Sequence, residues 1–246
     1  MTAAAAGSLA GQAVLVIGGS AGIGLETARQ AAAAGAEVIV TGRRPGPLAE
    51  AAAAVGAVGT ATFDAGDDDA LAAFFMGLDA PVDHVLVTAG GPYYESLKDM
   101  DFARARRALA EHPMVMAGVA RDGALAGKVT GSMTFMGGTG ARHPSIGIGM
   151  SSAMTAALPA LTASMALEVA PVRVNLIAAG FVDTPLSASL LGDQLDARRE
   201  QLASRLPIGR VVGPQDVAAL AVHLMVNSAL TGATYDIDGG QSLLSW

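Results

Sequence analysis

The chain has 246 residues, of which 52% are hydrophobic, and a formal net charge of −7. This length suits a single α/β domain with a large core, and the acidic balance argues against a nucleic-acid partner, because that binding needs a basic face. The absence of cysteine excludes disulfides and thiolate catalysis and fits a cytoplasmic protein.

The predicted elements alternate between strand and helix along the chain. We expect the alanine-rich residues 1–12 to form a flexible tail, since they lack the features of a signal peptide, and residues 13–246 to form one domain. A helix predicted over 99–125 should bend near Pro113. Residues 181–206 are predicted to be irregular and partly helical, on the substrate side. The other predicted strands lie at 14–17, 38–41, 61–63, 83–88, 128–136, 172–178 and 233–237, and the other helices at 25–34, 48–55, 67–78, 149–169 and 215–227.

This alternation is typical of an α/β fold of the Rossmann type, a doubly wound parallel sheet of about seven strands in a three-layer α/β/α arrangement. In such sheets a ligand binds beyond the carboxyl ends of the strands. The turns after the first, fourth, fifth and sixth strands should therefore converge on one cleft. The most apolar segment, 150–170, is interrupted by Pro159 and Glu168, which favours a buried or interface helix over a membrane span.

The glycine turn after the first strand is the strongest local signal. Gly18, Gly22 and Gly24 follow a G-x-x-x-G-x-G spacing between a predicted strand and a predicted helix. Glycines let the backbone approach a ligand, and the free N–H groups at a helix start attract negative charge. The turn is therefore predicted to hold the pyrophosphate of a dinucleotide.

Four segments of the chain resemble the short-chain dehydrogenase/reductase family. Residues 17–24 resemble its T-G-x-x-x-G-x-G motif, with Ile17 in place of threonine. Residues 87–90 resemble N-N-A-G without the asparagines. Residues 172–185 resemble the segment that ends in P-G-x-x-x-T, with Ala179 in place of proline, and residues 212–240 resemble the C-terminal helix and final strand.

The resemblance implies a nicotinamide cofactor. Asp64 would meet the adenine edge, although a carboxylate at a helix N-terminus is an equally good interpretation of this residue. The residues expected to bind the cofactor are Gly18, Ser20, Gly22, Ile23, Gly24, Arg43, Asp64, Ala89, Gly90, Val182 and Thr184.

The turn after the second strand bears on the choice of cofactor. In the family, an acidic residue there binds the adenosine ribose and repels a 2′-phosphate. Gly42 stands at that position here, and Arg43 follows it. A guanidinium suits a phosphate through paired hydrogen bonds, which favours NADP(H) over NAD(H). The alternative is that Arg43 and Arg44 are solvated surface residues.

The family's catalytic residues are missing. A Tyr-x-x-x-Lys pair, a serine and an asparagine are usual, but the alignment places Ser151 at the tyrosine, Thr155 at the lysine and Gly138 at the serine, and residues 109–111 contain no asparagine. No realignment restores the pair, because the chain's tyrosines and lysines lie elsewhere, at Tyr93, Tyr94, Tyr235, Lys98 and Lys128.

Two other residues are candidates for proton transfer. Tyr94 and Lys98 have the Tyr-x-x-x-Lys spacing on the expected rim of the cleft, although this spacing can be accidental, with Tyr94 covering the substrate pocket. His143, on the loop before the helix 149–169, could act as acid or base near neutral pH or could cap backbone groups. The remaining histidines show no metal-ligand spacing, and no metal site is predicted. The candidate catalytic residues are thus Ser151, Thr155, His143 and Tyr94.

Three functions remain open from the sequence. The first is a divergent oxidoreductase that uses NADP(H) on a small carbonyl or alcohol substrate. The second is a catalytically inactive cofactor-binding protein, and the third is the same fold adapted to a non-redox reaction. The resemblance also implies a homodimer or homotetramer through the helical regions 99–125 and 149–170. No membrane partner is expected.

Overall fold

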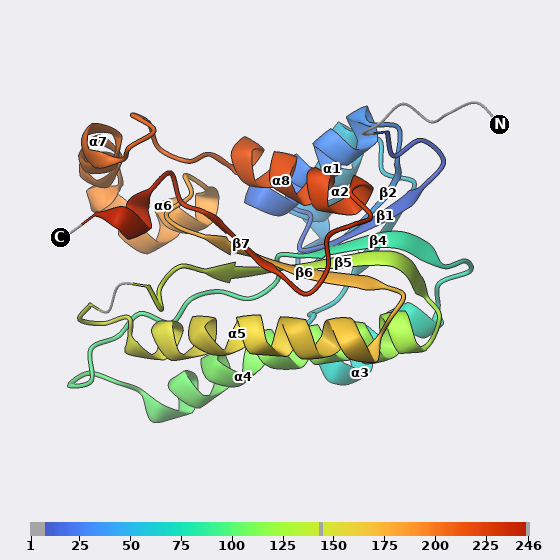
Figure 1. Ribbon diagram of the computed structural model, residues 1–246, viewed down its shortest axis with the longest axis horizontal. Coiled ribbons are helices and arrows are strands. Elements are labelled where there is room, and N and C mark those ends of the chain that lie inside the picture. The colour runs from blue at the N-terminus through green and yellow to red at the C-terminus, as the bar shows by residue number, and fades with distance from the viewer. Residues whose placement is uncertain (1–7, 143–144, 245–246) are drawn as a thin grey trace.

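The computed structural model describes residues 8–142 and 145–244, and within them one sheet of seven strands runs through the molecule (Figure 1). All strand pairs are parallel, in the order β3-β2-β1-β4-β5-β6-β7. The predicted fold class is confirmed. The strands are β1 (Ala13–Ile17), β2 (Glu37–Gly42), β3 (Gly59–Thr62), β4 (Val82–Val87), β5 (Val129–Gly138), β6 (Arg173–Ala179) and β7 (Thr234–Ile237).

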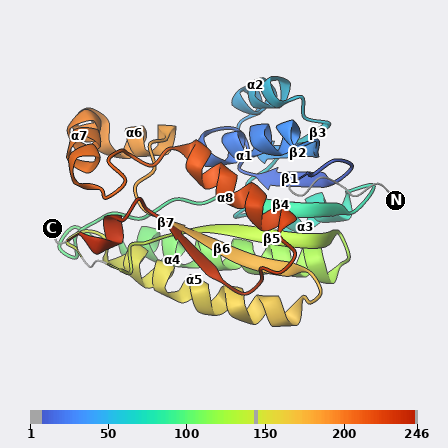
Figure 2. The same cartoon turned by 45° about the horizontal axis from the view of Figure 1, so that its top comes forward.

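Helices cover both faces of the sheet (Figures 1 and 2). One face packs against α3, α4 and α5, and the other against α1, α2 and α8, so each face has its own apolar core. Two further helices, α6 and α7, lie beyond one end of the sheet. The helices are α1 (Gly22–Ala33), α2 (Pro45–Val55), α3 (Asp68–Met76), α4 (Phe102–Gly118), α5 (Gly149–Glu168), α6 (Pro185–Leu191), α7 (Leu195–Arg205) and α8 (Pro214–Val226).

The strand order reverses at β1, which pairs with β2 on one side and with β4 on the other. The crossovers that follow β1 and β4 therefore go to opposite faces of the sheet and leave a crevice between their carboxyl ends. This crevice is the cleft on which the turns were predicted to converge.

The N-terminal segment differs from the prediction of a flexible tail over residues 1–12. Leu9 is fully buried in the core under α1, and its N–H donates to the carbonyl of Ala34 at 2.9 Å. The carbonyl of Gln12 accepts from the N–H of Glu37, also at 2.9 Å. The domain thus includes residues 9–12, because Leu9 packs into the core on the α1 side of the sheet. The alanine-rich sequence around Leu9 gave no sign of this burial.

The predicted bend at Pro113 is replaced by an irregularity further along. Pro113 lies within α4, where it lacks the N–H that would donate to the preceding turn, and α4 runs on to Gly118 before the π-helical stretch Val119–Leu125. The helix packs tightly at this point, since a Cβ on Gly118 would lie 2.8 Å from the Leu71 side chain. The change in helical geometry therefore occurs where α4 is pressed against α3.

The segment 181–206 is more regular than predicted. It forms α6 and α7, and the hydroxyl of Thr184 caps α6 by accepting from the N–H of Ser187 at 3.3 Å. Arg199 of α7 forms a paired salt bridge with Asp183, which precedes α6, at 2.8 and 3.0 Å. Figure 2 shows α6 and α7 beyond one end of the sheet.

Helix α5 is, among the described residues, the one helix that is long and apolar enough to cross a membrane by length and composition. It packs along β6 and α4, and its buried side includes Met154, Leu158 and Met165. This packing matches the predicted buried or interface helix.

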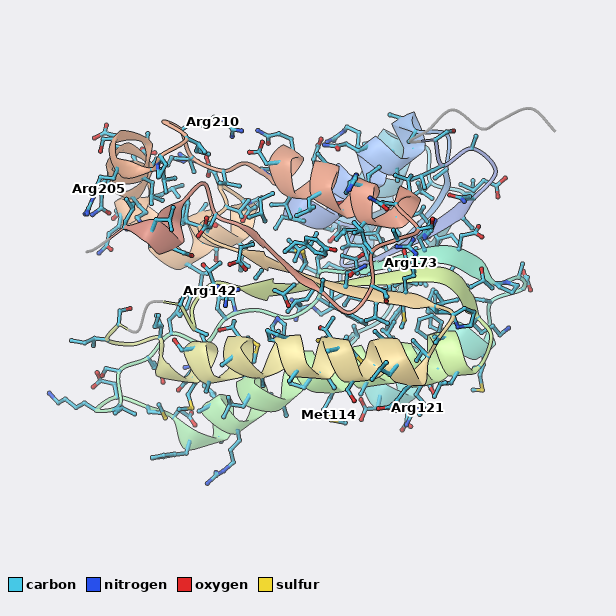
Figure 3. The ribbon with its side chains drawn as sticks, in the orientation of Figure 1. Met114, Arg121, Arg142, Arg173, Arg205 and Arg210 are labelled. Carbon is cyan, nitrogen blue, oxygen red and sulfur yellow. The ribbon has the colours of Figure 1, made fainter. Side chains whose placement is uncertain are left out.

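Arg173 fixes the far end of the fold. Its guanidinium lies between β6 and the end of α8 (Figure 3) and donates to the carbonyls of Leu224 and Met225, each at 2.7 Å. It also reaches the carbonyls of Asn227 and Leu230. The carbonyls of Leu224 and Met225 lie in the last turn of α8, where helix carbonyls lack partners within the helix.

His84 gives the fold a specific pH dependence. Its Nδ1 lies 2.8 Å from the Ser132 hydroxyl and its Nε2 lies 3.2 Å from Oε1 of Gln12. Burial, helped by the charge of Arg173, lowers the pKa of His84 from 6.5 to about 4, although Asp83 opposes the shift. As pH falls below about 6.5 the unfolded chain takes up this proton first, so stability is complete above that pH and is lost toward pH 4.

We predict that His84→Gln flattens this dependence. The wild-type free energy of unfolding should fall by up to about 3 kcal/mol more than that of the variant between about pH 7 and about pH 4, because only the wild type must bury a neutral imidazole. Urea unfolding across this range measures the difference. Equal pH slopes for the two proteins would contradict the assignment.

Candidate functional site

The turn after β1 is shaped by glycine backbone. Gly18 and Gly22 have φ values of 93° and 54°, which favour glycine. A Cβ on Gly24 would lie 2.3 Å from the carbonyl oxygen of Gly18, so the turn closes on itself. Helix α1 starts at Gly22, and the side chain of its N-cap, Ala21, makes no capping hydrogen bond. The first N–H groups of α1 are thus left for a ligand, as a phosphate site requires.

Thr88 supports this turn from β4. Its hydroxyl donates to the carbonyl oxygen of Gly18 at 3.0 Å and lies 3.3 Å from that of Ile17. A Cβ on Gly18 would lie 2.5 Å from the same hydroxyl. The sequence prediction missed this role, because it treated the residues before Ala89 only as lost asparagines.

The second wall of the crevice comes from the segment after β6. Thr184 lies across from the glycine turn, with its Cβ 3.5 Å from the position that a Cβ on Gly22 would take. Val182 pairs with Val212 in a short parallel bridge, which holds this wall in place. The fold therefore brings together the predicted cofactor residues of the turn after β1, such as Gly22, and those of the turn after β6, Val182 and Thr184.

The turn after β2 has no room for an acidic side chain without a shift of Ser20. A Cβ on Gly42 would lie 3.3 Å from the Ser20 hydroxyl. Arg43 is exposed and lines a cavity together with Gly90. The predicted residues Ser20, Arg43 and Gly90 therefore lie around one end of the crevice.

Asp64 does not cap a helix. Its Oδ1 accepts from the N–H of Gly66 at 3.0 Å and closes its own turn. The N-cap of α3 is Asp67, which accepts from the N–H groups of Asp69 and Ala70. The interpretation of Asp64 as a helix-terminal carboxylate was therefore wrong, and its expected place beside an adenine ring stays a prediction.

Ser151 and Thr155 stand at the positions of the missing tyrosine and lysine, but both hydroxyls are committed to the backbone. Ser151 is buried, donates to the carbonyl of Tyr93 at 2.7 Å and accepts from its N–H at 3.0 Å. Thr155 donates to the carbonyls of Ser151 and Ser152 at 2.9 and 3.1 Å. The loop after β4 thus fills the space beside Ser151 where a larger side chain would lie.

Tyr93 is held by its own surroundings. Its hydroxyl bonds to the Glu95 carboxylate and accepts from the N–H of Asp101 at 3.1 Å, and Arg104 lies over its ring at 5.6 Å from the centroid. Burial and the Glu95 carboxylate raise the pKa of Tyr93. This tyrosine is therefore a wall of the site and a poor proton donor at neutral pH.

The other proposed proton donors are not brought together. About half of Tyr94 is exposed, and the burial of the remainder raises the pKa of its hydroxyl. The loop around Tyr94 is not helical, so the four-residue spacing does not place Tyr94 and Lys98 on one helix face. His143 lies outside the described residues. The described part of the chain also holds no group of three or more His, Asp or Glu side chains suited to a metal ion.

His112 is a residue that the sequence analysis set aside as part of a regular element. Its ring packs against Gly90, where a Cβ would lie 2.6 Å from Cε1. Its Nδ1 is buried and has no hydrogen-bond partner within the described residues. Burial lowers the pKa of His112, against the raising effect of Glu111. A neutral imidazole therefore touches the turn after β4, directly after the stretch 109–111 that was searched for asparagine.

A cavity of about 340 Å³ opens between α4, the turn after β4 and the end of β2. It is large enough for part of a small-molecule ligand. Its lining residues are Arg43, Gly90, Gly91, Pro92, Tyr93, Arg104, Arg107, Ala108, Glu111 and Leu186.

This fold and its crevice have clear counterparts among known proteins. A family model described as enoyl-(acyl carrier protein) reductase matches residues 18–242. A solved short chain dehydrogenase/reductase family protein is 32% identical, with a TM-score of 0.81 and coverage of 96% of this chain and 100% of its own. This chain belongs to the short-chain dehydrogenase/reductase (SDR) family.

Three further relatives match nearly the whole chain, and the names of two of them state a cofactor. The NADP-dependent (R)-specific alcohol dehydrogenase of Lentilactobacillus kefiri is 28% identical to this chain, and the match covers 94% of this chain and 97% of the relative. The crystal structure of a small-chain dehydrogenase in complex with NADPH is 28% identical, with a TM-score of 0.79 and coverage of 95% and 99%. The short-chain dehydrogenase/reductase ATR9 of Stachybotrys chlorohalonatus is also 28% identical, over 96% of this chain and 99% of the relative.

We predict that Ser151→Ala destabilises this SDR by about 1–3 kcal/mol, because it leaves the buried N–H and C=O of Tyr93 unpaired. Ser164→Ala on the exposed side of the same helix is the matched control and should change stability by less than about 0.5 kcal/mol. Urea unfolding measures both. Equal stability of Ser151→Ala and the control would show that the loop is not held by this contact.

Proposed function

We propose that this SDR binds NADP(H) in the crevice between the glycine turn and the start of α6. The observation that carries the proposal is the uncapped start of α1, which the close approach of Gly24 to Gly18 places directly beside the end of β1. Its free N–H groups suit a pyrophosphate. Val182 and Thr184 would line the other side.

The 2′-phosphate form is favoured by the end of β2. Gly42 supplies no carboxylate to repel a phosphate. The guanidinium of the next residue, Arg43, can donate two parallel hydrogen bonds to a phosphate. The NADP-dependent and NADPH-bound relatives support the same choice.

We further propose that the reaction is hydride transfer between the cofactor and a small carbonyl or alcohol. The cofactor supplies the hydride, and the protein has to hold it against the substrate and provide a path for one proton. Ser151 and Thr155 are unsuited to that proton path because their hydroxyls serve the backbone. The remaining candidates for that path are Tyr94, water and the predicted His143, because the unpaired Nδ1 of His112 is buried where its ring packs against Gly90.

A second candidate is a protein that binds the cofactor without turning it over. The Ser151–Tyr93 contact favours it, because the chain's own loop occupies the family's reaction centre. Assay of NADPH oxidation over a panel of aldehydes and ketones separates the two. Turnover supports the oxidoreductase, whereas tight binding with no turnover supports the second candidate.

We also propose a cytoplasmic homodimer or homotetramer built on α4 and α5. Phe102 and Met114 on α4 and Leu167 on α5 are exposed, and Met114 projects away from the sheet (Figure 3). Small residues along the exposed side of α5 suit close helix packing. These residues are Ala153, Ala156, Ala157, Ala160 and Ala163.

We predict that the wild type binds NADPH more tightly than NADH and that Arg43→Ala weakens NADPH binding about tenfold or more, since it removes charged hydrogen bonds to the 2′-phosphate. NADH binding should not change. Nicotinamide fluorescence titrations measure both affinities, with the exposed neighbour Arg44→Ala as control. Binding of neither cofactor would overturn the proposed function, and an unchanged preference in Arg43→Ala would overturn the role of Arg43.

A further inference from the structure

The cavity beside the turn after β4 concentrates positive charge in an acidic protein. The chain has a net charge of −7 and only 15 lysines and arginines, yet Arg43, Arg104 and Arg107 line this one cavity. The acidic residue among its lining is Glu111. The local charge is therefore opposite in sign to that of the whole protein.

The arginines reach the cavity from two separate elements. Arg104, Arg107 and Glu111 lie three and four residues apart on one side of α4, so their side chains share a helix face. Arg43 comes from the turn after β2, far from α4 in the sequence, and Leu186 of α6 adds an apolar contact. Cations from the β2 end and from α4 thus border the same space.

Of these three arginines, Arg104 is the one that forms an ion pair within the described residues. Arg104 pairs with Glu95 at 2.9 Å and lies over the Tyr93 ring. Arg107 has the right spacing to pair with Glu111, but the described residues contain no ion pair between them within 4 Å, nor one that involves Arg43. Arg43 and Arg107 therefore border the cavity without an ion pair within 4 Å, although the Arg107 charge is near enough to Asp101 to help lower the pKa of that carboxyl.

We propose that the cavity binds an anionic group, a phosphate or a carboxylate, held between Arg43 and Arg107. Guanidinium groups bind both anions through paired hydrogen bonds, and the Arg104 charge strengthens the local potential. The volume of about 340 Å³ accommodates the anion together with the part of the ligand that contacts Pro92 and Leu186.

The anion has two possible sources. It is either the 2′-phosphate of the cofactor, in which case Arg107 is a second specificity residue beside Arg43, or an acidic group of the substrate that binds next to the cofactor. The first source rests on the proposed function, whereas anion binding by the cavity does not.

The test compares Arg107→Gln with Arg106→Gln. Arg106 is its exposed neighbour on α4 and does not line the cavity, so the control removes the same charge from the same helix. Isothermal titration calorimetry with NADPH, NADH and inorganic phosphate separates the two sources of the anion. Phosphate is added both to the cofactor-free protein and to the NADPH-loaded protein. Matching thermal melts confirm that both variants are folded.

We expect Arg107→Gln to lose about tenfold or more in affinity for at least one anion, because hydrogen bonds to charged groups are lost. Weaker NADPH binding with NADH unaffected identifies the cofactor phosphate, and weaker phosphate binding to the NADPH-loaded protein identifies a substrate anion. Identical behaviour of the two variants in every titration would overturn the proposal. If the wild type binds neither cofactor, the proposed function fails, and the phosphate titration of the cofactor-free protein still decides whether the cavity binds an anion.

Discussion

The close approach of Gly24 to Gly18 is the constraint on which this site depends. A Cβ on Gly24 would lie 2.3 Å from the carbonyl oxygen of Gly18, so only glycine lets α1 start this near the end of β1. Thr88 then holds the turn from the neighbouring strand β4. Because β1 and β4 border the place where the strand order reverses, this small turn fixes both the crevice and the direction of the α1 N–H groups.

The second feature of this SDR is the contact that fills the space beside Ser151, where the family usually has its catalytic tyrosine. Ser151 is too short to occupy the space of a phenol, and the backbone of Tyr93 moves into hydrogen-bond contact with it. Tyr93, Glu95 and Arg104 then lock the loop after β4. The cavity beside this loop is lined by Arg43, Arg104 and Arg107, so the described site offers more groups for binding an anion than for the family's usual proton transfer.

Local patterns were sufficient to predict the alternating strands and helices and the glycine turn, because each depends on neighbouring residues. They were not sufficient for Leu9, whose burial depends on α1 closing over it, or for the regularity of α6 and α7, which lie in a segment predicted to be irregular and only partly helical. The contact between Tyr93 and Ser151 joins residues 58 positions apart, and no periodicity records it. The role of His112 likewise depends on the fold bringing it against Gly90.

The central claim is that the glycine turn holds a dinucleotide, and the NADPH affinity of Gly22→Ala tests it most directly. Gly22 faces Thr184 across the crevice at a positive φ, whereas Gly46 on α2 has open space around it and provides the control Gly46→Ala. Nicotinamide fluorescence should show Gly46→Ala binding as the wild type does and Gly22→Ala binding about tenfold or more weakly, since strain and the added methyl group disturb the cradle. Equal NADPH affinity for Gly22→Ala and the wild type would contradict the account.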